Sequence, residues 1–282
     1  MNANYTLRLT GKKIVVYTVC ACLCALSLFP FWIMFVNASR ESNDIISNFS
    51  VIPGSYFGQN LKTLYQRQSF DIVGGMWNSF QISSVATILA VYISTLTAYG
   101  LVVYNYKLRT PAFTFIMVVL MIPTQVSAVG FFTFMYQLGL NNTYIPLMLP
   151  AAASPAVVFF MRQYMLGALP LEIVEAARID GSTEFSTFNR IALPIMKPAL
   201  ATQAIFIFIA NWNRLFEPSM IITSMNKYTL PMMVELLKSD RFRTDYGTVY
   251  MGLALTVLPL FVVYFLLSKY IIRGVAMGGV KE

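Results

Sequence analysis

The side chains that most often carry chemistry in proteins are scarce in this chain. The sequence has no histidine, which removes the commonest general base and the commonest metal ligand. Cys20, Cys22 and Cys24 fall inside a long apolar run, so we interpret them as small apolar residues rather than metal ligands or a disulfide framework. No Gly-x-x-x-x-Gly-Lys-Ser/Thr loop is present to hold nucleotide phosphates. We therefore predict no catalytic residue, no metal site and no cofactor bound by this chain. The sequence offers no residues that would support the function of a membrane enzyme.

Polar residues within apolar stretches are the next candidates, because a polar group is costly at membrane depth and often marks a solute pathway. Amides and hydroxyls could contact the hydroxyls of a neutral solute, or they could be satisfied between packed helices, and the sequence leaves both alternatives open. Arg214 and Glu217 are expected to reach the outer interface or to pair with each other. The residues placed on a candidate pathway are Gln81, Ser83, Thr124, Gln125, Ser127, Asn211 and Asn213.

The composition indicates a membrane protein. Of 282 residues, 57% are hydrophobic and 11% are charged, whereas soluble domains carry about a quarter charged residues. The apolar runs are continuous and close to the length of about 20 residues that crosses a bilayer as a helix. We therefore predict an all-α polytopic membrane protein with about six transmembrane helices. Their expected ranges are 14–36, 77–104, 113–136, 144–165, 199–216 and 248–271.

The basic residues indicate the orientation of the chain rather than a nucleic-acid partner. The net charge is +8, but Lys and Arg stand singly between apolar runs, so we predict membrane lipid as the surroundings and no nucleic acid. They are more frequent in the short loops that share a side with Lys107 and Arg190 than in the longer segments opposite. Both termini are therefore expected in the cytoplasm.

The same pattern gives the domain organisation. A cytoplasmic N-terminus is expected over residues 1–13, a transmembrane domain over 14–272 and a cytoplasmic C-terminal tail over 273–282. Two outer segments, near 38–76 and 217–247, mix aromatic and apolar residues with balanced charges. They are either solvated connectors or a docking surface for an extracellular partner.

A loop over residues 170–194, here called the elbow, is predicted to fold as two short helices around one turn. Pro170 suits a first helical position, Glu172 and Glu175 lie towards the positive end of the helix dipole, and Arg178 lies near its negative end. These residues predict a helix over 170–179.

The turn and the second helix of the elbow follow from the next residues. Gly181 accepts the left-handed conformation that ends a helix, and Ser182 can cap the next helix with Glu184 in its first turn. Pro194 and Pro198 mark the exit into the fifth apolar run. In the first helix, the small side chains of Ala176 and Ala177 would let another surface approach closely.

The elbow resembles the EAA signature of ABC importer permeases, on Glu175-Ala176-Ala177, Gly181 and Ile191-x-Leu193-Pro194. Ser182 stands where that family usually has Ala. The resemblance implies a coupling helix that sits in a cleft of a cytoplasmic ATPase, in a fold like that of type I ABC importers. The residues it assigns to ATPase coupling are Glu175, Ala176, Ala177, Asp180, Gly181, Ser182, Ile191, Leu193 and Pro194.

Other segments are similar to carbohydrate-type permeases of the maltose-like branch, namely 138–144, 211–218, 228–231 and 273–282. The N-terminal third matches that branch only in general layout. The resemblance implies a bacterial plasma-membrane permease for a sugar or oligosaccharide. It also implies a tail contact with the ATPase through Gly278, Gly279 and Lys281, for which a disordered end is the alternative.

The partners implied by the resemblance are a homologous permease subunit that forms a heterodimer, two ATPase subunits that bind ATP and Mg, and an extracellular or periplasmic solute-binding protein. Another solute, such as glycerol phosphate, an amino acid or a peptide, is the first alternative. The second is a channel or secondary transporter that works without ATP. Such proteins usually carry acidic residues within the membrane, whereas the acidic residues of this chain lie outside the predicted spans or near their ends.

Overall fold

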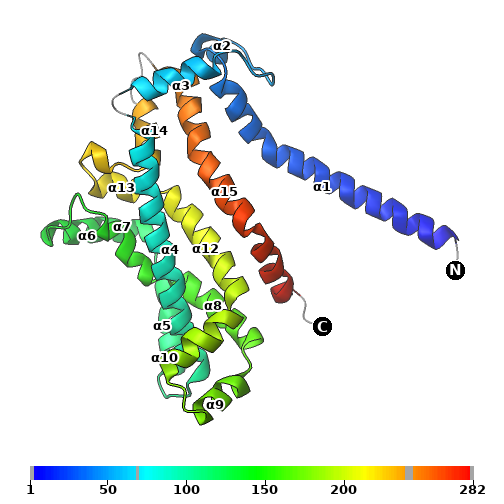
Figure 1. Ribbon diagram of the computed structural model, residues 1–282, viewed down its shortest axis with the longest axis vertical. Helices are drawn as coiled ribbons and strands as arrows, with labels where there is room; N and C mark the ends of the chain where they lie inside the picture. The colour runs from blue at the N-terminus through cyan, green and yellow to red at the C-terminus, as the bar shows by residue number, and fades with distance from the viewer. Residues whose placement is uncertain (1–2, 68–69, 239–243, 280–282) are drawn as a thin grey trace. The chain divides into compact units, whose positions relative to one another are not determined.

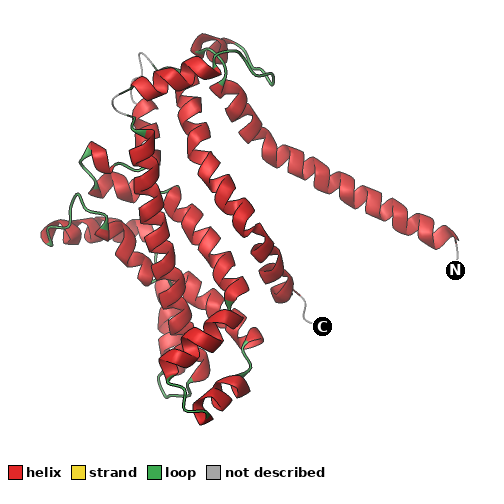
Figure 2. Cartoon of the chain, viewed as in Figure 1, coloured by secondary structure: helices red, strands yellow, loops and turns green. Residues whose placement is uncertain are grey.

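The computed structural model describes residues 3–67, 70–238 and 244–279, and within these ranges every regular element is a helix, as Figure 2 shows. The predicted all-α class is thereby confirmed. The chain forms two compact units. One combines the chain up to Phe70 with Val234–Val257, and the other combines Asp71–Met233 with the chain from Leu258 onward.

The first unit contains α1 (Ala3–Ala38), α2 (Ser42–Ser47) and α3 (Phe57–Gln66), together with the end of α14 (Leu230–Lys238) and the start of α15 (Tyr246–Gly279). The Asn60 side chain donates hydrogen bonds to the carbonyl oxygens of Ala38 and Arg40, both at 2.9 Å. The Ser42 hydroxyl accepts a hydrogen bond from the backbone N–H of Tyr246 at 2.9 Å. The end of α1, the α2–α3 segment and the start of α15 are therefore joined through polar side chains.

Four helical segments in the described part of the chain are long and apolar enough to cross a membrane: Lys13–Ala38, Ile72–Val103, Ile145–Ala168 and Tyr246–Phe265. A fifth arises if Glu184–Ile195 and Lys197–Trp212, which meet at 81°, are counted as one broken span. A multi-pass membrane protein is thus confirmed, although the expected number of about six spans is not. The three free cysteines lie exposed on α1.

The third expected span, 113–136, is not one helix. It consists of α5 (Arg109–Leu120) and α6 (Thr124–Gln137), with Pro123 in an extended conformation between them (ψ 124°). Pro has no N–H to donate and disfavours helical geometry in the residue before it, so the helix ends there. The fourth span is also divided, into α7 (Ile145–Met148), η1 (Leu149–Ala152) and α8 (Pro155–Ala168). Kinks were expected at these prolines, but the third span is interrupted completely.

The second unit is built around α4 (Ile72–Val103), which packs against α8 and α12 (Lys197–Trp212). Figure 1 shows α4 running uninterrupted beside these helices. One apolar cluster surrounds Ala98 and Tyr99 of α4 and includes Met161 and Met165 of α8, which are completely buried. A second cluster surrounds Ile82, about 24 Å further along the same helix at 1.5 Å per residue. One continuous helix therefore contributes to both apolar clusters.

The remaining helices of this unit are short. They are α9 (Leu171–Ile179), α10 (Glu184–Thr187), η2 (Phe188–Ala192), α11 (Leu193–Ile195), α13 (Phe216–Ile221) and η3 (Met225–Lys227).

The part of the second outer segment that belongs to this unit is tied to α4. Asn78 donates hydrogen bonds to the carbonyl oxygens of Asn226 and Tyr228, both at 3.0 Å, and the Ser79 hydroxyl accepts one from the N–H of Leu230 at 2.8 Å. This segment is therefore an ordered structure held by side chains rather than a loose connector.

A second tie to the same segment comes from Asn142, which has a positive φ of 56°. Its side-chain oxygen accepts hydrogen bonds from the N–H groups of Thr223 and Ser224, at 3.2 and 3.0 Å, and its amide donates to the Ser224 hydroxyl at 2.8 Å. Asn tolerates the left-handed region better than most residues, so both its backbone and its side chain suit this position.

We expect Asn142→Ala to destabilise the folded chain by about 1–3 kcal/mol, because two backbone donors lose their acceptor and Ala resists a positive φ. Thermal unfolding of the detergent-purified protein measures this change. The matched control is Asn141→Ala, since Asn141 is exposed. An equal melting temperature for the two variants would contradict the role assigned to Asn142.

Candidate functional site

The elbow begins with α9, which starts at Leu171. Pro170 precedes the helix as its N-cap, with an extended ψ of 123°, so it lies one position earlier than predicted. Glu172 occupies the first turn and Arg178 the last, as the dipole argument predicted.

The break of the elbow has the predicted geometry. Gly181 has a φ of 80°, in the left-handed region where Gly is favoured. Its N–H donates to the carbonyl of Arg178 at 3.0 Å, and the N–H of Ser182 donates to the carbonyl of Ala177 at 2.9 Å. This pair of bonds is the Schellman motif, which satisfies carbonyls at the end of α9.

The second helix of the elbow is capped by Thr183 rather than by Ser182, which corrects the prediction. The Thr183 hydroxyl accepts a hydrogen bond from the N–H of Ser186 at 3.3 Å. Ser182 belongs to the Schellman motif, and its hydroxyl accepts a hydrogen bond from the Thr187 hydroxyl at 3.0 Å. Glu184 lies in the first turn, as predicted. From α10 the chain passes through η2 and α11 and turns by 81° into α12.

One face of the elbow is buried in the second unit. Val174 of α9 and Ala192 of η2 are completely buried, and Phe188 is 1% exposed. The ring of Phe188 meets that of Tyr99 edge to face with centroids 5.3 Å apart, and that of Tyr92 at 5.7 Å. Such aromatic pairs add about 0.5–1.5 kcal/mol to the effect of burial. The elbow is therefore attached to α4 through its own core residues.

The opposite face of the elbow is free for contact. Of the residues assigned to coupling, Glu175, Ala176, Asp180 and Gly181 are exposed, whereas Ala177 is buried and packs inward. The small side chain of Ala177 therefore serves packing within the chain, and Ala176 is the alanine that leaves the surface open.

The two most exposed large apolar residues of the elbow were not identified from the sequence. Ile179 is 87% exposed and Phe185 is 66% exposed. Large exposed apolar patches rimmed by polar residues mark contact surfaces, so these two residues are candidates for contact with a partner. The signal was present in the sequence, because Ile179 falls outside the i, i+3 spacing of the buried Val174 and Ala177.

A charged cluster links the two helices of the elbow to the end of α4; it consists of Arg178, Glu184, Tyr99 and Tyr104. Arg178 donates to both carboxylate oxygens of Glu184, from Nε at 2.6 Å and from Nη2 at 3.3 Å. The Tyr99 hydroxyl donates to the same carboxylate at 3.4 Å, and the guanidinium lies 5.3 Å from the centre of the Tyr104 ring. The hydrogen bond from Arg178, followed by one from Tyr104, holds the pKa of Glu184 below its ordinary value, so the carboxylate is ionised.

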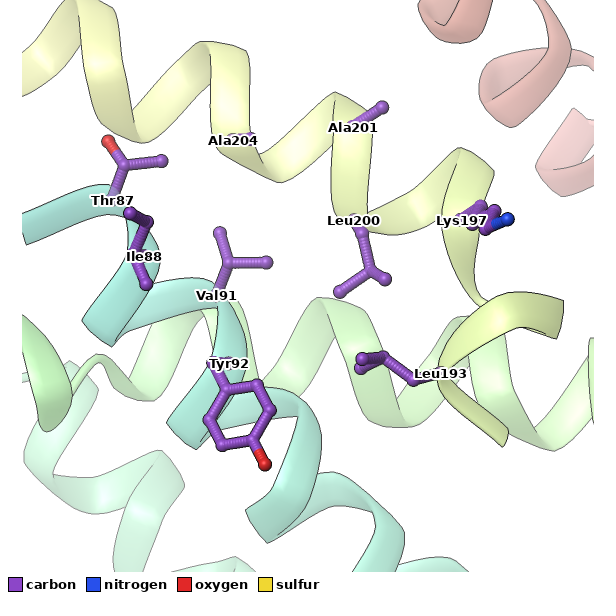
Figure 3. Close-up of a pocket in the computed structure, with 9 residues that line it drawn as sticks. All are labelled: Thr87, Ile88, Val91, Tyr92, Leu193, Lys197, Leu200, Ala201 and Ala204. Carbon is purple, nitrogen blue, oxygen red and sulfur yellow. The ribbon is translucent and has the colours of Figure 1, made fainter. Parts of the chain in front are cut away.

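The remaining coupling residues lie at the exit of the elbow. Ile191 and Leu193 are half-buried and Pro194 is exposed. Leu193 lines a hollow of about 510 Å³ between α4 and α12, in which Leu200 and Val91 project towards the same space (Figure 3). The other residues around it are Thr87, Ile88, Tyr92, Lys197, Ala201 and Ala204. Leu193 therefore faces the chain's own helices.

The residues proposed from the C-terminus lie at the end of the described chain. Helix α15 continues to Gly279, through the segment expected as a tail from Arg273. Gly278 and Gly279 end this helix, and Lys281 lies outside the described residues.

The candidate pathway residues lie on different helices. Ser83 of α4 is completely buried, and Asn211 of α12 is 7% exposed; in the described structure the Ser83 hydroxyl and the Asn211 side-chain oxygen have no hydrogen-bond partner. Gln81 is half-buried and donates to Asn78 at 3.3 Å, while Asn213 is exposed. The side chain of Gln125 is outside the described residues. An unpaired buried oxygen costs free energy of folding, so Ser83 and Asn211 remain candidates for a polar contact.

Comparison with known proteins places these features in a family. A sequence model for the "Binding-protein-dependent transport system inner membrane component" family matches residues 90–277, which include the elbow. The chain is 33% identical over 276 residues to the lactose transport system permease protein LacG of Rhizobium radiobacter, covering 98% of this chain and 99% of that protein. It is 31% identical to the arabinooligosaccharides transport system permease protein AraQ of Bacillus subtilis, covering 92% of each.

Some relatives are named for a different solute, and solved structures share the fold. The sn-glycerol-3-phosphate transport system permease protein UgpE of Salmonella typhi is 29% identical, covering 94% of this chain and 96% of that protein. A chain in the crystal structure of a bacterial ABC transporter that imports the acidic polysaccharide alginate superposes with a TM-score of 0.80 at 18% identity, covering 94% of this chain and 97% of that one.

We expect Glu184→Gln to loosen the elbow, because it removes the charge that binds Arg178. Both side chains are more than a third exposed, so the loss is about 0.5–1 kcal/mol and local opening rises roughly threefold. Trypsin cleavage after Arg178 in the purified protein reports this opening. Glu175→Gln, exposed in the helix of Arg178 and beyond its first turn, should cleave at the wild-type rate. Because the pKa of Glu184 is lowered in the folded state, its contribution is complete above the ordinary carboxyl pKa and is lost as the pH falls through the folded pKa. If Glu184→Gln were cleaved no faster than the control, the charged cluster would not hold the elbow closed.

Proposed function

We propose that this chain, which belongs to the family of binding-protein-dependent transport system inner membrane components, is the permease subunit through which a sugar or an oligosaccharide enters the cell. The observation that carries the proposal is similarity over nearly the whole chain to permeases named for lactose and arabinooligosaccharide transport. The chain is a transport subunit rather than an enzyme, in keeping with the names of these relatives.

The proposed assembly places this chain beside a homologous permease, above two cytoplasmic ATPase subunits and below a solute-binding protein. Its elbow and both termini then face the cytoplasm. The resemblance of the elbow to the EAA signature supports the ATPase contact, and its exposed face supplies the surface. The outer segment near 226–230 is fixed to α4 by Asn78 and Ser79, so it offers the binding protein a rigid contact surface.

In this proposal the elbow transmits movement mechanically from the ATPase to α4. ATP, bound with Mg by the partner ATPase and hydrolysed there, supplies the energy, and this chain contributes mechanical transmission. The exposed face, with Ile179 and Phe185, would seat in the ATPase. The buried face, with Val174 and Phe188, and the charged cluster make a displacement of α9 act on the end of α4. A two-state equilibrium between inward-facing and outward-facing forms can be biased through such a rigid contact.

The second candidate cargo is a phosphorylated polyol. It is favoured by the relative named for sn-glycerol 3-phosphate, at 29% identity. The two cargoes differ in charge, so one uptake assay separates them.

The test is uptake by the importer purified with its partner subunits and reconstituted in proteoliposomes. We expect ATP-dependent accumulation of labelled lactose or arabinotriose, and none of labelled sn-glycerol 3-phosphate. Accumulation of the phosphate ester alone would replace the sugar proposal with the second candidate. Accumulation without ATP would contradict the importer mechanism itself.

We expect Gly181→Val to leave membrane insertion intact while detaching or uncoupling the ATPase. A Cβ at Gly181 meets nothing within 4 Å, so the effect is backbone strain of about 1–3 kcal/mol at a φ of 80° rather than a clash. Membrane yield, ATPase co-purification and transport per ATP measure the three outcomes.

The matched control for this variant is Gly130→Val in α6, where an added Cβ also meets nothing within 4 Å but no positive φ is required. If Gly181→Val retained both the ATPase and normal transport, the turn would not be a mechanical joint.

A further inference from the structure

A cavity of about 400 Å³ lies in the second unit at the break between α5 and α6. Its walls come from the end of α5, from α6, from the α7–η1–α8 segment, from Arg214 after α12 and from Glu217 of α13. Figure 1 shows α6, α7 and α13 gathered beside α4. The volume falls in the range of about 300–1,000 Å³ that small-molecule sites occupy.

The cavity exists because two spans are interrupted next to each other. Pro123 separates α5 from α6, and Pro146, Pro150 and Pro155 divide the α7–η1–α8 segment and line the cavity. Broken helices cannot pack along their full length. Irregular backbone at membrane depth is tolerated where it lines a cavity, and in transporters such interruptions mark solute sites.

Two opposite charges stand at this cavity. Arg214 follows the end of α12 and Glu217 lies in the first turn of α13, and both line the space. The structure records no ion pair between them, although pairing was one of the two outcomes expected from the sequence. Arg supplies five N–H donors and an ionised Glu supplies acceptors only, so the two side chains offer complementary hydrogen bonds to a ligand.

Aromatic rings form an adjoining wall. Phe132 is 8% exposed, and its ring meets those of Phe131 and Phe216 edge to face, with centroids 5.7 and 6.0 Å apart. These contacts hold the rings in place. Aromatic faces are apolar and match the C–H face of a sugar ring, while Ser127, also in the lining, can both donate and accept a hydrogen bond.

We propose that this cavity receives one unit of a neutral sugar during transport, with Arg214 and Glu217 on its hydroxyls and Phe131 and Phe132 against its ring. The inference rests on the proposed function and adds the position of the cargo in the membrane and its charge. A hydroxyl can accept from the guanidinium and donate to the carboxylate. A phosphate or carboxylate group would be attracted by Arg214 but repelled by Glu217. An anionic cargo therefore gains less binding free energy here than a neutral one.

The test measures access to the cavity in the intact purified importer without ATP, in a background of Cys20→Ser, Cys22→Ser and Cys24→Ser. Ser127→Cys places a thiol in the lining, and Ser47→Cys, exposed on α2, is the matched control. A water-soluble maleimide is applied alone, with lactose, with arabinotriose, or with sn-glycerol 3-phosphate. We expect one of the neutral sugars, at saturation, to slow modification of the Ser127→Cys thiol about tenfold and to leave the control unchanged. We expect sn-glycerol 3-phosphate to slow modification of neither thiol.

Substitutions then test the two charged residues. Arg214→Gln and Glu217→Gln should each abolish protection, whereas Lys62→Gln, exposed on α3, should retain it. An importer that accumulates a neutral sugar yet shows no protection would overturn the cavity assignment and leave the proposed function standing. Equal protection by sn-glycerol 3-phosphate would overturn the preference for a neutral ligand. ATP-dependent uptake of sn-glycerol 3-phosphate without either sugar would overturn the proposed function and this inference with it.

Discussion

The structure of the candidate site depends on the burial of Phe188 against Tyr92 and Tyr99. This contact attaches the elbow to α4, and the completely buried Val174 and Ala192 complete the attachment on either side. Side chains in a close-packed core cannot shift independently, so the elbow and the end of α4 move together. Without that packing, a contact on the exposed face would displace a loop and leave the membrane helices where they were.

The features of the elbow that could be predicted from the sequence are local. A helix ended by Gly181 requires only the conformational freedom of Gly and the polarity of the residues beside it. The same holds for the apolar runs, whose length and continuity predict helices without knowledge of their neighbours. The choice of Thr183 over Ser182 as the cap was missed because the Ser182 N–H belongs to the Schellman motif and its hydroxyl bonds with that of Thr187, which only the three-dimensional turn shows.

The features that could not be predicted depend on residues far apart in the chain. Tyr99 and Glu184 are 85 residues apart and meet through the packing of α4 against the elbow. Ala177 looked suited to a partner contact, but its orientation follows from the burial of Val174 on the same face. The break at Pro123 was expected as a kink, because prolines are tolerated within membrane helices when neighbouring groups satisfy the backbone. Whether such a helix bends or stops depends on what packs beside it.

Helix α4 gives the second unit a stiff connection between its two apolar clusters. It has no proline, whereas the spans around it are divided at prolines or meet at a sharp bend. Near Tyr99 it holds the elbow, and near Ile82 it packs in the cluster that contains Phe132, a residue of the cavity wall. An intact helix transmits displacement along its axis because its backbone hydrogen bonds are continuous, while interrupted spans leave space for a ligand. In the proposed mechanism, the distribution of prolines therefore suits one helix to transmission and its neighbours to cavity formation.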